Sequence, residues 1–348
     1  MNEKCGVKMK FLLYLSQNYS FEIMRPLLHV MLEEQHDVRW FVEGNKVNHA
    51  LFQKDDRVLN CVDDVIRFNP DATFLPGNIV PSFIPGIKVQ LFHGFEWKKK
   101  GHFRIRGCFD LYCTQGPFFT RRFNQLRERN PHFTVKETGW TKLDNLFQSD
   151  YRPPSVSSKP TILYAPTFSP RLTSADALFE QILALSTQQS WNWKVKFHPK
   201  MATKTVERFE QAQHGQLDVV QSSCINPLLT ECDVMLSDTS SVITEFLLLG
   251  KPVITYQNAQ PEPVLLNINS PTELPAAINA SLAMDPSLAQ TIDSYAKDKH
   301  PYRDGLSARR VLDATLEEIQ HYPRPGTLAK PKNWLRNLKL RKRLGYWR

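Results

Sequence analysis

The sequence lacks the cysteine patterns that hold structural metals. Its six cysteines in 348 residues include no C-x-x-C pair, and their spacings match no zinc site. The D-x-D sequence that commonly holds a nucleotide-bound divalent ion is also missing. We therefore expect free thiols in a reducing compartment, no metal ligands and no cofactor, with only a loosely held divalent ion left open.

Long hydrophobic runs are also missing. The longest run near the N-terminus, residues 11–15, is far too short to cross a bilayer, and no small-residue cleavage site accompanies it. These absences predict neither a signal peptide nor a membrane-spanning helix, and hence a cytoplasmic location.

Three common motifs do not occur. The chain contains no G-x-x-x-x-G-K-[ST], no G-x-G-x-x-G and no G-x-S-x-G. Their absence argues against a P-loop nucleotidase, a dinucleotide-binding domain and an α/β-hydrolase.

Acidic residues are absent from residues 321–348, although this stretch holds nine bases. These bases account for the whole formal net charge of +9, because the remaining chain carries 35 bases and 35 acids. A nucleic-acid-binding domain more often spreads its charge over a folded face, so we expect no nucleic-acid partner. The nine bases are Arg324, Lys330, Lys332, Arg336, Lys339, Arg341, Lys342, Arg343 and Arg348.

Large apolar side chains lie between these bases. Trp334 and Leu338 are four residues apart, and Leu335 and Leu338 three apart, as on one face of a helix. A basic helix with aromatic residues is suited to an anionic membrane surface, and we favour this interpretation of the tail. A disordered solvated tail and an RNA-binding tail are the alternatives.

The body of the chain has the composition of a folded α/β protein. A hydrophobic fraction of 41% excludes disorder. Strand and helix patterns alternate on both sides of residues 151–160, a stretch rich in Pro and Ser that is typical of a linker. We predict two Rossmann-like, doubly wound domains facing a cleft, at residues 1–150 and 161–322, and a basic amphipathic tail at 323–348.

The hydrophobic periods place the elements. In the first domain we expect strands at 10–16, 37–42, 72–75, 88–92 and 110–113, and helices at 21–35 and 117–127. In the second we expect strands at 161–165, 193–197, 218–220, 233–236 and 252–256, helices at 176–185, 226–231 and 240–249, and mainly helix over 272–319.

Polar groups follow several of these strands, where doubly wound sheets bind ligands. His93 follows a predicted strand, and Gly94 and the cations Lys98 and Lys99 come after it. A neutral imidazole beside cations suits a general base that takes a proton from a hydroxyl near phosphate. The alternative is a satisfied loop histidine beside a solvated run of charge.

The second domain repeats this arrangement. Lys196 and His198 share one side of a predicted strand, and His198 lies at the strand end. Its imidazole suits a hydrogen-bond donor to diphosphate oxygens, and the two histidines could converge across a cleft.

A third strand end carries four hydroxyls, on Ser237, Thr239, Ser240 and Ser241, just before a predicted helix. The unpaired N–H groups of a helix start attract anions, and the hydroxyls add donors. Simple N-capping is the alternative, but it needs only one hydroxyl. We therefore favour phosphate binding.

These segments together resemble the CDP-glycerol glycerophosphotransferases, the teichoic-acid primase and polymerase family. His93-Gly94 and its lysines resemble the family's W-H-G-x-x-x-K-K-x-G, and residues 139–144 resemble G-Y-P-R-x-D. Residues 163–168 are similar to L-Y-A-P-T-W, residues 197–199 to the second histidine segment, and residues 237–241 to S-D-x-S-S. Residues 250–253 follow in order, and residues 304–310 resemble a terminal D-G-x-x-x-x-R, so the resemblance covers roughly residues 88–312.

The resemblance implies a GT-B fold, with an acceptor-side domain followed by a nucleotide-donor domain. It implies attack of an acceptor hydroxyl, on a lipid-linked saccharide, at the glycerol-bearing phosphorus of CDP-glycerol, with release of CMP, at the inner face of the cytoplasmic membrane. His93 would be the base, and His198 would act at the diphosphate. Asp238 would position cytidine, ribose or a histidine. The remaining candidates are Lys196, Ser237, Thr239, Ser240, Ser241, Glu245 and Thr167 for the donor, and Gly94, Lys98, Lys99 and Lys142 for acceptor or phosphate.

The sequence departs from the family pattern at several positions. Phe92 replaces the Trp before His93, the Pro-Arg step is replaced at residues 141–143, and Glu245 stands where Asp is usual. CDP-ribitol or another activated donor therefore stays open. The competing hypotheses are a GT-B glycosyltransferase or nucleotide-sugar epimerase using a UDP- or CMP-sugar, and a nucleotide or RNA binder without activity.

Overall fold

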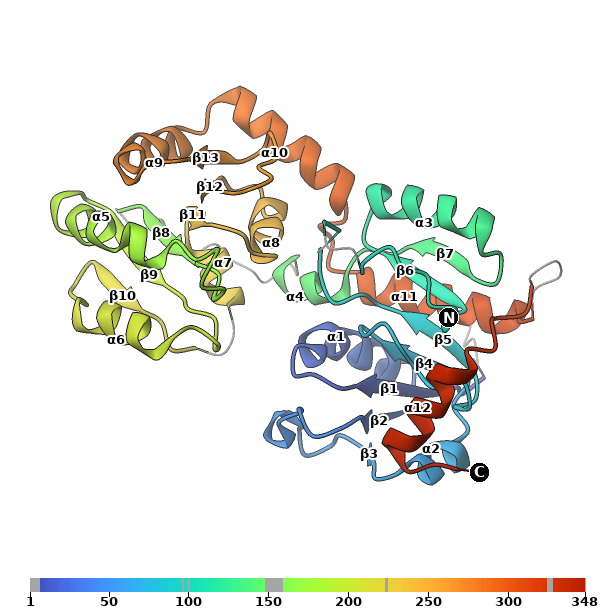
Figure 1. The fold of residues 1–348 in the computed structure, drawn as a ribbon. Coiled ribbons are helices and arrows are strands. Elements are labelled where there is room, and N and C mark those ends of the chain that lie inside the picture. The colour runs from blue at the N-terminus through green and yellow to red at the C-terminus, as the bar shows by residue number, and fades with distance from the viewer. Residues whose placement is uncertain are drawn as a thin grey trace. The chain divides into compact units, whose positions relative to one another are not determined.

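A computed structural model describes residues 7–95, 97–98, 101–147, 159–222, 225–323 and 328–347. The chain forms two compact units (Figure 1). One comprises Met1–Gln148 and Lys299–Arg348, and the other comprises Ser149–Asp298. Each unit is built around one parallel sheet, so the predicted α/β, GT-B class with two Rossmann-like units is confirmed.

The first unit contains a seven-stranded sheet in the order β3-β2-β1-β4-β5-β6-β7, with neighbouring strands parallel. Its centre is almost wholly apolar, as expected of parallel strands covered on both faces. The strands are β1 (Lys10–Leu15), β2 (Asp37–Val42), β3 (Val58–Leu59), β4 (Ala72–Leu75), β5 (Ile87–Gln90), β6 (Leu111–Thr114) and β7 (Thr134–Glu137).

Helices cover this sheet. The apolar face of α1, with Ile23, Leu27 and Met31, is buried, and α1 packs beside α11. The helices of this unit are α1 (Ser20–Glu33), α2 (Val62–Phe68), α3 (Pro117–Arg129), α4 (Asp144–Phe147), α11 (Ser307–His321) and α12 (Trp334–Leu344), with short 3-10 turns η1 (His49–Leu51) and η2 (Thr141–Leu143).

The second unit contains a six-stranded parallel sheet in the order β10-β9-β8-β11-β12-β13. Its core joins Trp193, Tyr164, Phe209 and neighbouring apolar side chains on both sides of β8. The strands are β8 (Thr161–Tyr164), β9 (Asn192–Val195), β10 (Leu217–Val219), β11 (Val234–Ser237), β12 (Val253–Tyr256) and β13 (Leu266–Ile268). The helices are α5 (Ala175–Gln188), α6 (Thr203–Gln211), α7 (Asn226–Glu231), α8 (Val242–Leu248), η3 (Pro271–Glu273), α9 (Leu274–Ala283) and α10 (Pro286–Lys299).

The predicted domain boundary at residue 322 is wrong. After α10 the chain returns to the first unit, so Lys299–Arg348 belongs there. The reason is packing: α11 contacts α1, β6 and η2, and its buried face includes Val311 and Leu312. Helical periodicity alone shows that a helix has a buried face but not which sheet covers it.

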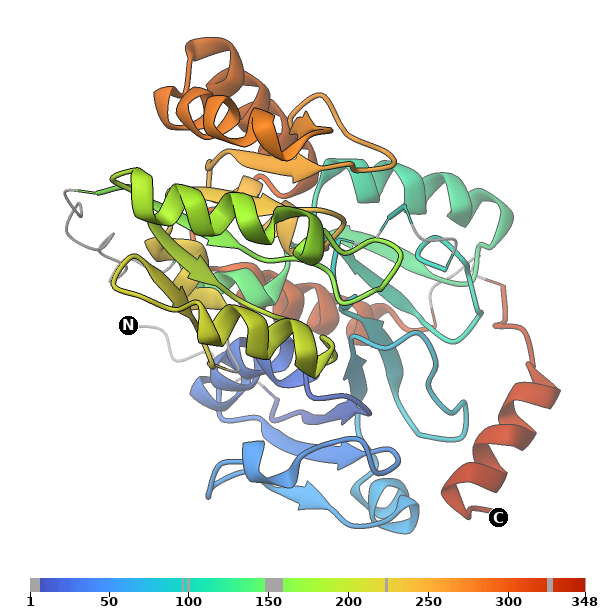
Figure 2. The ribbon, with the colours of Figure 1, turned by 60° about the vertical axis from the view of Figure 1, so that its left-hand side comes forward.

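The tail forms a docked helix, α12, on the first unit (Figures 1 and 2). Leu340 is 3% exposed, and the amide of Asn333 donates to the carbonyl oxygens of Arg106 and Gly107. The connections from β4 to β5 and from β5 to β6 contain no helix in their described parts, and α12 contacts both of them.

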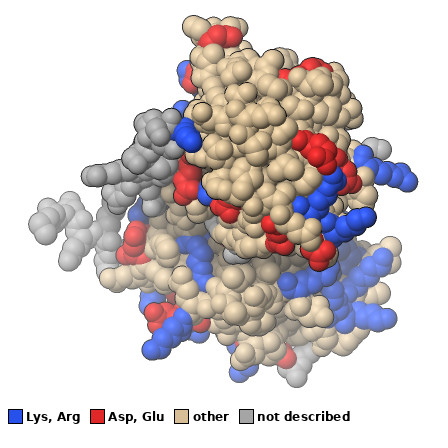
Figure 3. Space-filling view, turned by 90° about the vertical axis from the view of Figure 1, so that its left-hand side faces the viewer, with Lys and Arg blue, Asp and Glu red and all other residues tan. Residues whose placement is uncertain are grey.

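Several tail bases serve this docking. Lys330 lies 2.7 Å from the Asp110 carboxylate, and Arg343 pairs with Glu43. Arg336 donates to the carbonyl oxygen of Arg106, and Arg341 lies 4.6 Å from the ring centre of Phe83. Part of the positive charge of the tail therefore pairs with groups of the first unit. Figure 3 shows both acidic and basic groups on the face that it draws, with several basic groups together at its lower right.

No helix in the described ranges combines the length and apolar character needed to cross a membrane.

Candidate active site

The carboxyl ends of parallel strands meet at one edge of each sheet, and the predicted site residues follow these ends. In the first unit, His93 follows β5. In the second unit, Thr167 follows β8, His198 follows β9 and Asp238 follows β11. Because β9, β8 and β11 are adjacent in the sheet, the structure brings the three donor-side segments together.

Asp238 joins the loops after β8 and β11. Its side chain is buried, and one carboxylate oxygen accepts hydrogen bonds from the backbone N–H groups of Thr167 (2.9 Å) and Thr239 (2.6 Å). The other accepts from the N–H (2.9 Å) and hydroxyl (3.0 Å) of Ser174. With four donors already bound, this carboxylate shapes the site through the backbone of the loops that it holds.

The loop held by Asp238 presents Phe168 to His198. The two rings are stacked, with centroids 4.4 Å apart and planes 29° apart. The ammonium of Lys200 lies 5.7 Å from the centre of the same Phe168 ring. Phe168 thus links the β8 and β9 loops, and it stands where the family pattern has a tryptophan.

The His198 imidazole is set up as a hydrogen-bond donor. Its Nδ1 accepts the backbone N–H of Lys200 at 3.1 Å, so the neutral ring carries its proton on Nε2. Partial burial, followed by the charges of Lys200 and Lys196, lowers the pKa of His198. At neutral pH the ring is therefore neutral and offers an Nε2–H to an acceptor.

The hydroxyl segment is less uniform than its sequence indicates. Ser237 is buried and donates to the Ala165 carbonyl oxygen at 2.7 Å, so its hydroxyl supports the loop. Ser240 accepts a 3.4 Å bond from the Val242 N–H, whereas Ser241 is exposed and makes no side-chain cap bond.

The helix after this segment also differs from the prediction. The helix α8 begins at Val242, two residues later than predicted, and has only seven residues. Thr239 is exposed and Glu245 is buried in the first turn of α8. Lys196 is half-buried and donates to the carbonyl oxygen of Phe197.

On the first unit, His93 lies in a tightly held loop. Its ring is partly exposed, with its centroid 5.9 Å from that of Tyr19 in the loop after β1. The residue before it, Phe92, has a φ of 59°, in the left-handed region that non-glycine residues rarely adopt. Gly94 is buried behind it.

The remaining acceptor-side candidates differ in their environments. Lys98 is exposed, and Lys99 lies outside the described residues. Lys142 has a side chain only 12% exposed, with its ammonium 3.4 Å from Glu22 and 5.4 Å from the Trp140 ring centre. In the described part of the chain, no group of three or more His, Cys, Asp or Glu side chains could hold a metal ion.

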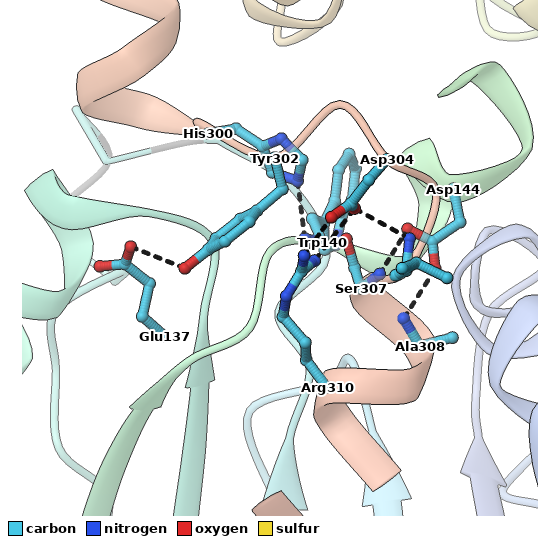
Figure 4. Close-up of polar contacts among 10 residues, drawn as sticks. Glu137, Trp140, Asp144, His300, Tyr302, Asp304, Ser307, Ala308 and Arg310 are labelled. Atoms are coloured by element: carbon cyan, nitrogen blue, oxygen red, sulfur yellow. Dashed lines mark hydrogen bonds and ion pairs between the residues drawn. The ribbon is translucent and has the colours of Figure 1, made fainter. Parts of the chain in front are cut away.

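The segments at 137–144 and 300–310 form a polar cluster within the first unit (Figure 4). Asp144 accepts the N–H groups of Ser307 (2.9 Å) and Ala308 (2.7 Å) at the start of α11. Burial raises the pKa of Asp144, and the helix N–H bonds oppose that rise. The carboxylate therefore acts as the anionic cap of the returning helix.

The rest of this cluster surrounds two aromatic side chains. The Tyr302 hydroxyl donates to Glu137 at 3.0 Å, and Arg310, paired with Asp304, lies 4.1 Å from the Tyr302 ring centre. Burial, and then the Glu137 charge, raises the pKa of Tyr302 to about 12. His300 Nε2 accepts the backbone N–H of Trp140 at 2.9 Å.

A family model for CDP-glycerol:poly(glycerophosphate) glycerophosphotransferase matches residues 114–317, more than half of the chain. The chain belongs to this family. The match begins at Thr114, so the His198 and Asp238 segments lie inside it and the His93 segment precedes it.

The chain is also similar to two proteins of teichoic acid synthesis, one in sequence and one in structure. The teichoic acid ribitol-phosphate polymerase TarK of Staphylococcus aureus is 28% identical over an alignment of 159 residues, which covers 41% of this chain and 30% of TarK. The matched part thus spans about a third of that relative's length. A wall teichoic acid polymerase TagF variant with CDPG has a TM-score of 0.62 at 12% identity, covering 89% of this chain and 88% of that one.

A UDP-N-acetylglucosamine 2-epimerase shares the fold to a similar degree. Its TM-score is 0.60 at 14% identity, covering 93% of this chain and 99% of that one. At such identities the likeness of both structures concerns the fold alone.

Sequence reasoning missed the residues that hold the site together. Phe168, Ser174 and Trp140 carry no charge or recognisable metal-ligand pattern, and their roles depend on contacts between separate loops. The aromatic residue at the end of the L-Y-A-P-T stretch was the one available signal for Phe168.

Proposed function

We propose that this protein transfers glycerol phosphate, or a related alditol phosphate, from its CDP derivative to a hydroxyl of a surface glycopolymer precursor. The observation that carries the proposal is the donor-side arrangement in a member of this family: a neutral His198 Nε2–H donor, stacked on Phe168, beside the segment that Asp238 holds. Lys196 and Lys200 add positive charge next to it. This set of groups suits a diphosphate bearing a nucleoside.

The reaction forms one bond and breaks one bond. The acceptor oxygen bonds to the glycerol-bearing phosphorus, and the anhydride bond from that phosphorus to the bridging oxygen breaks. CMP leaves with the bridging oxygen and its electron pair, and the acceptor hydroxyl gives its proton to a base. His198, the cations beside it and the hydroxyls of Ser240 and Ser241 would stabilise the charge on the diphosphate.

His93 is the proposed base. It lies at the carboxyl end of β5 in the other unit, on a loop whose backbone is rigidly held. General-base assistance typically contributes about 100- to 10,000-fold to a rate, so removal of this imidazole should cost an amount in that range. The convergence of His93 and His198 on one substrate stays a prediction.

The test supplies CDP-glycerol, CDP-ribitol and a lipid-linked saccharide, and follows CMP release together with product mass. His93→Ala should abolish most turnover and leave CDP-glycerol binding nearly unchanged, whereas His198→Ala should weaken binding. His321→Ala, an exposed histidine on α11, is the matched control and should behave as wild type. Absence of CMP release with every CDP-alditol would refute the proposed transfer.

The shared fold supports one second candidate, a UDP-sugar 2-epimerase. An epimerase yields an altered sugar without a new phosphodiester and without a lipid acceptor. Incubation with UDP-N-acetylglucosamine alone therefore separates the two functions, because only the epimerase forms a product there.

We further propose that α12 binds an anionic membrane surface at the cytoplasmic face, where a lipid-linked acceptor would be located. The side of α12 that faces away from the protein carries Trp334 (74% exposed), Leu335 (78%) and Leu338 (55%), with the exposed Lys339 and Lys342. Exposed apolar and basic side chains on one helix face are typical of an interfacial helix. The inward side of α12 contacts the protein at the same time, so the folded unit itself would present this face.

A point substitution tests this membrane binding better than removal of the tail, because Leu340 and Lys330 of the tail also support the fold. Leu338→Glu should reduce sedimentation with phosphatidylserine-containing vesicles several-fold. Leu32→Glu, on an equally exposed leucine of α1, is the control and should have no effect. Equal sedimentation of both variants, or equal binding to neutral vesicles, would contradict the proposal.

A further inference from the structure

The carbonyl groups of the two residues on either side of His93 are each bound by a buried side-chain donor. The indole Nε1–H of Trp140 donates to the carbonyl oxygen of Phe92 at 3.2 Å. The amide Nε2–H of Gln115 donates to the carbonyl oxygen of Gly94, also at 3.2 Å. Trp140 is 2% exposed and Gln115 is fully buried, so neither bond competes with bulk water.

The two donors come from neighbouring strand ends. Gln115 directly follows β6, and Trp140 lies three residues after β7, in a sheet whose order runs β5-β6-β7. The carboxyl ends of two successive strands thus reach back to the loop of a third. Because the loop is bound both before and after His93, its backbone has little freedom to change the direction of the His93 side chain.

The backbone at this point needs such support. Phe92 adopts a φ of 59°, a conformation that costs a non-glycine residue free energy and persists only where surrounding contacts impose it. The Phe92 ring is anchored against His102 (centroids 5.4 Å apart) and Phe123 (5.0 Å). With the ring anchored, the Trp140 bond fixes the orientation of the Phe92–His93 peptide.

Trp140 is itself held in place. Its backbone N–H donates to His300 Nε2 at 2.9 Å, and its ring packs edge-on against Phe95 with centroids 5.1 Å apart. The residue before it, Gly139, has a φ of 82°, and a Cβ there would lie 2.5 Å from the Ser307 hydroxyl. The indole N–H is therefore pointed at Phe92 by the returning segment of the chain.

We propose that Gln115 and Trp140 are positioning residues that aim the His93 imidazole, a role that rests on His93 being the base of the proposed transfer. Neither side chain touches the reacting atoms. Trp140 fixes the Phe92–His93 peptide and Gln115 fixes the Gly94–Phe95 peptide, so that the loop holds the imidazole ready for the acceptor hydroxyl. A displacement of about 1 Å in a catalytic group can cost on the order of 100-fold in rate.

The test compares variants that each remove one donor and keep a large apolar side chain in its place. Trp140→Phe removes the indole N–H and keeps an aromatic ring, and Gln115→Met removes the amide. Each should lower kcat roughly 10- to 100-fold and leave KM for the CDP donor within about twofold, because the donor site lies on the other unit. The two variants are independent, so a folding failure in one leaves the other as the test.

Gln90 provides a matched control. It is 1% exposed, and its amide donates to the Pro76 carbonyl oxygen at the same 3.2 Å, in a loop that does not contain His93. Gln90→Met should lower the unfolding midpoint about as much as Gln115→Met and leave kcat near wild type. If Gln115→Met and Gln90→Met lower kcat equally, the positioning role is wrong and the bond is merely structural.

A double variant separates this inference from the proposed function. If Gln115 acts through His93, then His93→Ala with Gln115→Met should be no slower than His93→Ala alone. Additive losses would overturn the positioning role and leave His93 as the base. Full activity of His93→Ala would instead refute the role of His93 itself, and the positioning role with it.

Discussion

His300 should make the first unit sensitive to acid. It is 1% exposed, packed against Phe95, Phe147 and Tyr302, and its Nε2 accepts the Trp140 N–H at 2.9 Å. Burial lowers the pKa of His300 from 6.5 to about 4. Protonation of Nε2 would also remove the acceptor that holds Trp140.

The sign of the effect follows from linkage. Below pH 6.5 His300 of the unfolded chain becomes protonated, whereas in the folded chain it stays neutral until about pH 4. The free energy of unfolding therefore decreases as the pH falls from 6.5 to 4. One pKa unit corresponds to about 1.4 kcal/mol, which makes the loss between pH 8 and pH 5 about 2 kcal/mol.

Urea unfolding at pH 8 and pH 5 measures this loss. The free energy of unfolding of wild type should fall by about 2 kcal/mol more than that of His300→Gln, whose amide oxygen can still accept the Trp140 N–H. His321→Gln, an exposed histidine of the same unit, should follow wild type. An equal pH dependence of wild type and His300→Gln would refute the reasoning, whatever the stability of the variant at pH 8.

Three further outcomes follow from buried charged groups. Burial, and next the Lys330 charge, lowers the pKa of Lys88 to about 7, so stability should rise by about 3 kcal/mol from pH 7 to pH 9.5, and Lys88→Met should lose this rise in thermal melts. Asp144→Asn keeps one of two acceptor oxygens at the α11 start and should lower the free energy of unfolding by about 1–2 kcal/mol in urea titrations. Asp238→Asn should weaken CDP binding roughly tenfold in calorimetry. The substitution weakens the bonds to Ser174, and the loop between β8 and α5 can then move Phe168 away from the His198 ring.

Hydrophobic periodicity predicted the elements whose apolar side chains are buried in the core of their unit. Residues 37–42, 72–75 and 226–231 have the predicted limits, because their apolar runs end where polar or turn residues begin. The elements β3, β7 and α6 were not predicted, because their mixed polarity reflects partial exposure at or near the sheet edges. Edge strands bury only part of their surface, so their composition carries a weak signal.

The site was predictable in its parts rather than in its assembly. The placement of His93, His198 and the 237–241 segment after strands follows from sequence alone, since a buried run ends before each of them. The roles of Asp238 and Ser237 did not follow, because their partners lie 64 to 72 residues away in the chain. Such partners become visible only when two loops meet at one sheet edge.

The family segments at 139–144 and 304–310 illustrate how a motif can be explained by packing instead of chemistry. Gly139 leaves room for Ser307, Asp144 caps α11 across the same contact, and Asp304 pairs with Arg310 on the face of Tyr302. Together they attach the returning segment to the first sheet, and this attachment places His300 against the Trp140 N–H. Because Trp140 in turn binds the carbonyl oxygen beside His93, the same residues that close the fold set the geometry of the proposed base. A substitution such as Asp144→Asn should therefore lower kcat as well as stability, whereas an equally destabilising change on the second unit should spare the His93 loop.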